Sequence, residues 1–119
     1  MRWPRFKPCW KRSVRRGDVH ALAAPSGSRG HERRGRRYAV VVQTDFLQEL
    51  STVVIVPTST TALATVFRPE VQFAGRKTRV LTEQIRALDR SRLGRRAGTL
   101  AESDLRAVDD ALRVVLGLF

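Results

Sequence analysis

The pattern of hydrophobic positions predicts several short strands followed by one helix. The strongest strand signals are residues 38–44 (YAVVVQT) and 52–56 (TVVIV), which are β-branched runs with apolar residues on both faces, as expected of central strands. Weaker strand patterns cover residues 18–24, 66–73, 78–85 and 96–100. Pro69 restricts its strand to a sheet edge or a kink, because proline cannot donate a ladder hydrogen bond.

Helical patterns are fewer. Residues 45–50 fit one helical turn capped by Asp45, and residues 88–93 fit another short turn. A true amphipathic helix is predicted near the C-terminus, where apolar residues recur at helical spacing at Leu105, Val108, Leu112, Val115 and Leu116. Gly117 is placed to end this helix.

Closely spaced strands with one terminal helix predict a mainly β fold of the α+β class. We expect a small curved β-barrel of about five to seven short strands with the amphipathic helix packed across it. The chain of 119 residues is long enough for one core, so residues 15–119 are expected to form a single domain.

Residues 1–14 have a different composition. They hold two prolines, five basic residues and three aromatics without any periodicity, which predicts a flexible basic arm. Trp3 and Trp10 could stack on nucleic-acid bases, or the segment could be an extension without a function.

The excess of positive charge gives the first indication of function. The chain carries 23 Lys and Arg against 11 Asp and Glu, a net charge of +12, and its pI is about 11.6. Twelve of these cations lie in the first 37 residues. Such a charge favours an anionic partner, above all nucleic acid, although solubility alone is the alternative explanation.

The cysteine and histidine content and the hydropathy argue against a disulfide-bonded, a metal-binding or a membrane-spanning protein. A single cysteine, Cys9, allows no intrachain disulfide and favours a cytoplasmic location. One cysteine and two separated histidines do not make a metal-ligand set, so we expect no metal and no cofactor. No apolar run approaches the roughly 20 residues that cross a bilayer, so no membrane partner is expected.

The densest positive charge directly precedes a buried strand. Residues 30–42 read GHERRGRRYAVVV, in which Glu32 is the only acid beside four arginines. Repulsion among these arginines needs a polyanion, a paired acid or water to relieve it.

Four segments resemble the MazF/PemK toxins of bacterial toxin–antitoxin pairs. These are RRGDV at 15–19, GHERRGRRYAVVV at 30–42, VIVPTST at 54–60 and VLTEQIRALDRSRLGRRAGTL at 80–100, in the order of the family. The resemblance implies an SH3-like barrel that forms a homodimer, cleaves RNA at short sequence motifs without metal, and is neutralised by an antitoxin.

The same resemblance assigns site residues. The family's catalytic arginine maps to Arg37, its hydroxyl residue to Ser59, and its acid to Glu32, while Thr60 is assigned a supporting role. The chain departs from the family at three positions: Tyr38 replaces a usual proline, Ser59 a more usual threonine, and His20 a residue that is usually aromatic.

These residue types suit the cleavage of RNA. A guanidinium such as that of Arg37 is always charged and binds phosphate in a fork, and Ser59 would orient the scissile phosphate. Alternatively, PTSTT is a strand end whose hydroxyls satisfy nearby backbone groups. His31 or His20 could transfer protons near neutral pH, or both could be ordinary polar residues.

Further residues are assigned to RNA binding. Phosphate contacts supply affinity without sequence information, and five residues are candidates for contact with RNA: Arg29, Arg33, Arg34, Arg36 and Gln84. Gln84 fits equally well as a polar residue at the edge of the core or as a contact to a dimer partner.

The sequence therefore predicts an endoribonuclease toxin that acts on single-stranded RNA (mRNA, tRNA or rRNA) and is inhibited by an acidic, partly disordered antitoxin segment. Two alternatives remain open. One is a gyrase poison on the same fold, which would use the hydrophobic C-terminal residues VVLGLF. The other is an RNA-binding module without catalytic activity.

Overall fold

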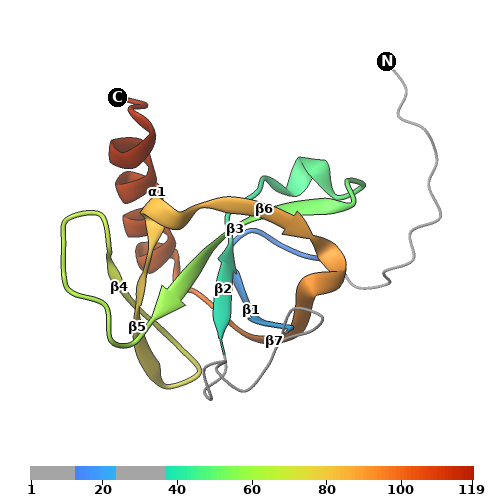
Figure 1. Cartoon of the computed structure of the whole chain (residues 1–119), viewed down its shortest axis with the longest axis horizontal. Coiled ribbons are helices and arrows are strands. Elements are labelled where there is room, and N and C mark those ends of the chain that lie inside the picture. Colours follow the sequence, from blue (N-terminus) through green and yellow to red (C-terminus); the bar gives the residue numbers. More distant parts are fainter. Residues whose placement is uncertain (1–12, 24–36) are drawn as a thin grey trace, which may run out of the picture.

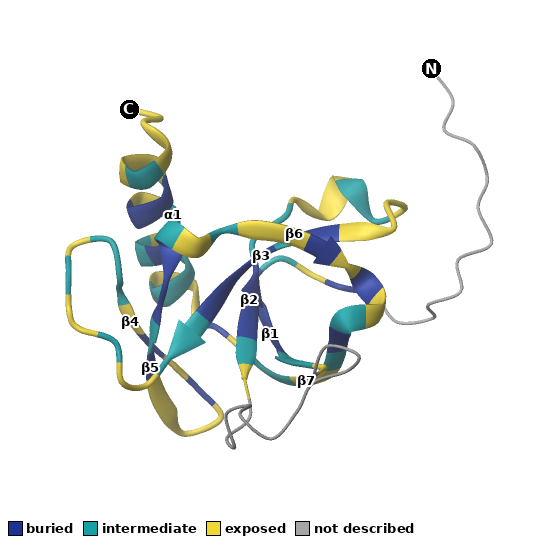
Figure 2. Cartoon of the chain, viewed as in Figure 1, coloured by how far each residue is buried: buried dark blue, intermediate teal, exposed yellow. Residues whose placement is uncertain are grey.

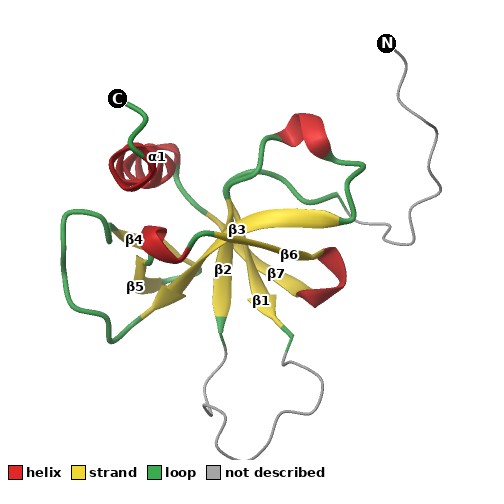
Figure 3. Ribbon diagram, turned by 45° about the horizontal axis from the view of Figure 1, so that its top comes forward, coloured by secondary structure: helices red, strands yellow, loops and turns green. Residues whose placement is uncertain are grey.

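The computed structural model describes residues 13–23 and 37–119 of the chain. These residues form an antiparallel sheet, three 3-10 turns and one helix (Figures 1 and 3). The strands are β1 (Asp18–Leu22), β2 (Tyr38–Val41), β3 (Thr52–Ser59), β4 (Glu70–Phe73), β5 (Arg76–Val80), β6 (Arg86–Asp89) and β7 (Leu93–Thr99). The helical elements are η1 (Asp45–Leu47), η2 (Thr82–Gln84), η3 (Arg90–Arg92) and α1 (Glu102–Leu116).

The sheet is strongly bent because β3 pairs with three neighbours. The strand order is β4-β5-β3-β2-β1-β7. One edge of β3 pairs with β2, whereas the other edge is divided between β6, along residues 52–55, and β5, at Thr58 and Ser59. The far ends of the order then approach each other: a Cβ atom on Gly98 of β7 would lie 3.3 Å from the Cβ of Phe73 in β4. This curled, barrel-like sheet with a C-terminal helix confirms the predicted fold class.

Both faces of the central strands are buried. Val40 and Val56 belong to a cluster under the helix, together with residues of β1, β4 and β5. Ala39 and Ile55 point the opposite way into a second cluster, which β6 and β7 cover. This double burial, which appears as the dark interior of Figure 2, explains why β2 and β3 are apolar at successive positions.

The helix lies where its periodicity predicted. Val108 and Leu112 on one side of α1 are buried against the sheet, and Gly117 ends the helix with a left-handed φ of 70°. Arg16, two residues before β1, donates a hydrogen bond to Asp109 of the helix. No helix in residues 13–23 and 37–119 is both long and apolar enough to cross a membrane.

Several predicted boundaries were wrong, among them the following three. The strand expected over residues 66–73 begins only at Glu70, after Pro69. The strand expected over residues 78–85 starts at Arg76 and ends at Val80, and the following residues form the turn η2. The helical turn expected over residues 88–93 is partly β6, because residues 86–89 pair with the first half of β3.

Two details concern the ends of elements. The cap of η1 is Thr44, whose hydroxyl accepts a hydrogen bond from the Phe46 amide, and not Asp45 as predicted. Asp45 instead accepts a hydrogen bond of 2.8 Å from the Arg16 amide. Residues 1–12 of the expected arm lie outside the described residues, whereas Val14 is buried and exchanges two backbone hydrogen bonds with the Gln48 side chain.

Candidate active site

Two neighbouring strands bring Arg37 and Ser59 to the same end of the sheet. Arg37 directly precedes β2, and Ser59 is the last residue of β3. The strands pair with Ala39 opposite Pro57, and the Thr58 hydroxyl donates a 3.3 Å hydrogen bond to the Tyr38 carbonyl. Continuing this antiparallel register places Arg37 opposite Ser59. The Arg37 carbonyl also accepts a 2.8 Å hydrogen bond from the Leu22 amide, which fixes its backbone to β1.

A cavity of about 590 Å³ opens at this end of the sheet. Four predicted site residues, Arg37, Ser59, Thr60 and Gln84, line it together. The other described residues of its wall come from β2, β3, the β4–β5 hairpin and their flanking segments: Tyr38, Pro57, Thr58, Thr61, Phe73, Arg76, Thr78 and Leu81. The cavity is the size of an ordinary small-molecule site and has charged, hydroxyl and aromatic groups in its wall.

Ser59 is partly engaged in a local turn. Its oxygen accepts a 3.2 Å hydrogen bond from the Thr61 amide and lies 3.3 Å from the Thr61 hydroxyl. The alternative interpretation of this stretch as a strand end with locally satisfied hydroxyls thus has a structural basis. A hydroxyl has one proton and two lone pairs, however, so Ser59 keeps the capacity to donate to a ligand while accepting from Thr61.

Side-chain hydrogen bonds connect the loop after Ser59 to the turn η2, which contains Gln84. Two nitrogens of the Arg68 guanidinium, Nε and Nη2, donate to one oxygen of Glu83, at 3.0 and 2.5 Å, and the Thr82 hydroxyl donates to the Phe67 carbonyl. The hydrogen bonds from Arg68 lower the pKa of Glu83 below its ordinary value. These contacts link the loop that follows Ser59 to the turn η2, which ends at Gln84.

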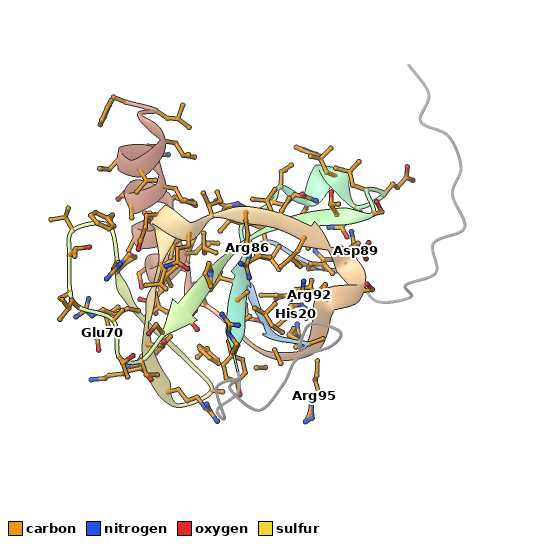
Figure 4. The ribbon with its side chains drawn as sticks, viewed as in Figure 1. His20, Glu70, Arg86, Asp89, Arg92 and Arg95 are labelled. Carbon is orange, nitrogen blue, oxygen red and sulfur yellow. The ribbon has the colours of Figure 1, made fainter. Side chains whose placement is uncertain are left out.

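The structure does not bring His20 to this cavity. His20 lies on β1, only 3% exposed, and its Nδ1 is 3.0 Å from the Gly94 carbonyl on β7 (Figure 4). Its Nε2 has no hydrogen-bond partner within the described part of the chain. Six other predicted site residues lie outside the described residues: Arg29, His31, Glu32, Arg33, Arg34 and Arg36.

Arg76 and Thr78 of β5 line the cavity but were not predicted as site residues. Their signal was weak, because RKTRV shows no clear alternation of polar and apolar residues. Tyr38 was noted only as a departure from the family pattern, and in the structure its ring lies in the cavity wall beside Arg76.

The family to which the chain belongs follows from its relatives. Residues 15–116 match the model of the PemK-like, MazF-like toxins of type II toxin–antitoxin systems. The endoribonuclease MazF of Staphylococcus epidermidis is 38% identical over 112 residues, which are 88% of this chain and 92% of that protein. A candidate toxin of Mycobacterium tuberculosis is 49% identical over 75 residues, or 63% of this chain and 70% of that protein.

Solved structures share the fold. MazF from Deinococcus radiodurans superposes with a TM-score of 0.72 at 24% identity, covering 90% of this chain and 99% of that chain. An endoribonuclease from a mycobacterial species, solved in complex with its cognate antitoxin, gives a TM-score of 0.75 at 20% identity and covers 90% and 98% of the two chains. The chain therefore belongs to the PemK-like, MazF-like toxins of type II toxin–antitoxin systems.

Proposed function

We propose that this toxin is an endoribonuclease that cuts single-stranded RNA at short sequence motifs, with Arg37 and Ser59 as its catalytic residues. The observation that carries the proposal is the cavity that both side chains line from adjacent strands. The proposal is also supported by a relative named as an endoribonuclease, which is 38% identical along 88% of this chain.

The proposed reaction uses the nucleophile that RNA itself contains. The 2′-oxygen attacks the adjacent phosphorus while its proton passes to a base, and the bond from phosphorus to the 5′-oxygen breaks. The leaving 5′-oxygen takes up a proton, so the products are a 2′,3′-cyclic phosphate and a 5′-hydroxyl. The protein needs only to align the groups, stabilise charge on the phosphate oxygens and move protons, so no metal is required.

The proposed site residues have roles that fit their chemistry. The Arg37 guanidinium carries a permanent charge and would bind the phosphate oxygens in a fork. Ser59, assisted by Thr60, would donate a hydrogen bond that orients the same phosphate. Arginine is a poor proton carrier because of its high pKa, so His31 is the proposed proton-transfer group, oriented with Arg37 by Glu32. The buried position of His20 gives no support for a similar role.

Affinity for RNA is assigned to the arginines that precede β2 and to Gln84. Neutralising Arg33, Arg34 and Arg36 together is expected to flatten the salt dependence of RNA binding. Each lost phosphate contact reduces the number of counterions that binding releases from the RNA. An unchanged slope would mean that these arginines do not contact phosphate.

The proposed partners are a second copy of the chain and an antitoxin. With a net charge of +12, the chain is suited to bind an acidic, partly disordered antitoxin segment, which would compete with RNA for the same surface. Mycobacterial and Deinococcus structures of this fold contain an antitoxin. The cytoplasm is the proposed location, since RNA substrate and antitoxin would both be met there.

One experiment tests the function directly. The purified protein is incubated with a long RNA in the presence of EDTA, and the new 5′ ends are mapped. Discrete cuts that disappear in Arg37→Ala are expected. Cleavage only after a divalent metal is supplied would contradict the metal-independent reaction, and intact RNA under all conditions would contradict the endoribonuclease assignment.

A gyrase poison on the same fold is the second candidate. The observation that favours it is the exposure of three apolar residues at the C-terminal end, where Leu116, Leu118 and Phe119 are 48, 62 and 99% exposed. Intact topoisomerase activity alongside RNA breakdown would exclude this function. An RNA-binding module without catalysis would instead bind RNA and leave it uncut.

A further inference from the structure

The hairpin of β4 and β5 places an arginine that has no assigned role at the edge of the cavity. Its two turn residues, Ala74 and Gly75, both have positive φ values, 50° and 76°, as a two-residue type I′ turn requires. Such a turn sets the register tightly, so Phe73 and Arg76 lie directly opposite each other. Both side chains line the cavity that contains Arg37 and Ser59.

Arg76 is held against an aromatic pair. The central carbon of its guanidinium lies 5.3 Å from the centroid of the Tyr38 ring. Tyr38 in turn meets Phe73 in an edge-to-face contact, with ring centroids 5.3 Å apart and an angle of 62° between the ring planes. A cation over a ring face at this distance is attracted to it, so Tyr38 helps to hold the Arg76 guanidinium at the cavity.

The alternation of β5 separates Arg76 from the adjacent lysine. Arg76 and Thr78 line the Arg37–Ser59 cavity, whereas Lys77 lines a different cavity, between β4 and the start of α1. This is the expected result of side chains that point to opposite faces at successive positions of a strand. Lys77 is therefore a matched control: it carries the same charge on the same strand but faces away from the proposed site.

An exposed cation and a buried hydroxyl line the cavity from β5. Arg76 has no carboxylate oxygen within 4.0 Å among the residues that the structure describes. Thr78 is 5% exposed, and its buried hydroxyl lacks a hydrogen-bond partner in the same residues. The Arg76 side chain is exposed, so its N–H groups, which water otherwise solvates, are accessible to an anionic ligand in the cavity.

We infer that Arg76, positioned by Tyr38, binds a phosphate of the RNA that flanks the one held by Arg37. This inference rests on the proposed function, because it names a second contact of the same substrate. The proposed ligand is the backbone, since a fork of N–H donors with permanent charge matches phosphate oxygens. A backbone contact supplies affinity without sequence information, so loss of Arg76 weakens binding but leaves the cleavage motif unchanged.

Binding of an RNA oligonucleotide containing the mapped motif tests the inference. The full chain carries Arg37→Ala, so that the RNA stays intact, and fluorescence anisotropy is measured over a range of salt. Adding Arg76→Gln is expected to weaken binding about tenfold, as for the loss of one charged hydrogen bond. The slope of log K against log [salt] should become less steep by about 0.7, the value for one phosphate contact on a single strand. Adding Lys77→Gln instead is expected to change both quantities much less.

Tyr38 variants test how Arg76 is held. Tyr38→Phe keeps the ring under the guanidinium and is expected to bind RNA like the parent. Tyr38→Leu removes the ring and is expected to move the affinity toward that of Arg76→Gln. Thermal unfolding followed by circular dichroism establishes that each variant is folded, and a double variant of Tyr38→Leu and Arg76→Gln should be no weaker than Arg76→Gln alone, because both changes remove the same contact.

The outcomes separate the two proposals. Equal affinities and slopes for Arg76→Gln and Lys77→Gln would overturn the role of Arg76, even if the unaltered protein cuts RNA. A changed cleavage motif in Arg76→Gln would overturn the phosphate contact in favour of base recognition. If the unaltered protein binds RNA but never cuts it, the endoribonuclease proposal fails, while the slopes measured with a single-stranded oligonucleotide that it binds still decide the role of Arg76. If it does not bind RNA, both proposals fail.

Discussion

Arg37 and Ser59 line one cavity from the facing ends of β2 and β3. Their positions depend on two central strands of the sheet, in which Val40 and Val56 are fully inaccessible to solvent. Dense packing of these strands keeps the backbone at both positions from shifting. A fixed backbone at both positions suits the electrostatic stabilisation of a reacting phosphate that we propose for this cation and hydroxyl.

Replacement of Arg37 is expected to abolish most RNA cleavage without destabilising the fold. Arg37→Ala should lower kcat by about 10²–10³, the usual effect of removing one group that stabilises transition-state charge. Arg37→Lys should recover only part of the rate, because an ammonium group keeps the charge but loses the fork. The thermal midpoint should change little, since the Arg37 side chain is exposed. Cleavage rates and unfolding curves for the three proteins provide the test, and a rate within a few-fold of the unaltered protein would refute the role.

Ser59 variants distinguish catalysis from local structure. Ser59→Ala should lower kcat/KM by about 10- to 150-fold, which corresponds to a hydrogen bond of about 1.5–3 kcal/mol to a charged group. Ser59→Thr should be at least as active as the unaltered protein, because it keeps the hydroxyl and restricts its rotamer. If Ser59 serves only the turn with Thr61, Ser59→Ala will lower the unfolding free energy and leave kcat/KM unchanged.

Replacement of Ala74 in the β4–β5 turn is expected to stabilise the protein. Ala74 has a φ of 50°, a left-handed conformation that costs an L-residue about 1–2 kcal/mol. Ala74→Asn creates an Asn-Gly turn, the preferred pair for this geometry, and is expected to stabilise the protein by about 1 kcal/mol. Gly75→Ala should have the opposite effect through backbone strain alone, because a Cβ there meets nothing within 4 Å. Urea unfolding measures both, and an unstable Ala74→Asn would contradict the argument.

Glu83 is expected to make stability depend on acid pH. Its pKa is lowered in the folded protein by hydrogen bonds from Arg68, so the folded state binds the proton less tightly than the unfolded state does. The resulting stabilisation is present above the ordinary pKa of 4.5 and is lost as the pH falls through the lower, folded value.

Glu83→Gln therefore should be less stable than the unaltered protein at pH 7, and the difference should shrink below about pH 4.5. Thermal unfolding of both proteins from pH 7 to pH 3 provides the measurement. Glu70→Gln serves as the control, because the Glu70 carboxylate is half exposed and 4.0 Å from Arg79, a pair that contributes little. A difference between Glu83→Gln and the unaltered protein that stays constant with pH would contradict the prediction.

Local sequence patterns were sufficient for elements in which buried positions recur in a regular pattern. The runs at β2 and β3 are apolar at successive positions because one core cluster lies on each side of them. The helix was recognisable because only one of its sides is buried, and Gly117 supplies the left-handed residue that ends it. The resemblance to a family then predicted that Arg37 and Ser59 share one site, although no local pattern connects them.

Elsewhere the outcome depended on partners distant in sequence. Residues 86–89 form a strand because they pair with an edge of β3. The local pattern, which predicted a helical turn over residues 88–93, contains no information about that pairing. His20 was a chemical candidate by its residue type, but its strand carries it into contact with Gly94. Arg76 showed no signal as a site residue until the hairpin turn placed it over Tyr38.

Residue patterns in this chain thus established the strands of the core, the terminal helix and the excess of positive charge, because burial periodicity and charge are properties of neighbouring residues. The shared cavity, the position of Arg76 and the burial of His20 arose only when the sheet curled around β3. Strand register and closure of the sheet depend on contacts between segments that are distant in the sequence. The free energy of those contacts cannot be assigned to any one segment.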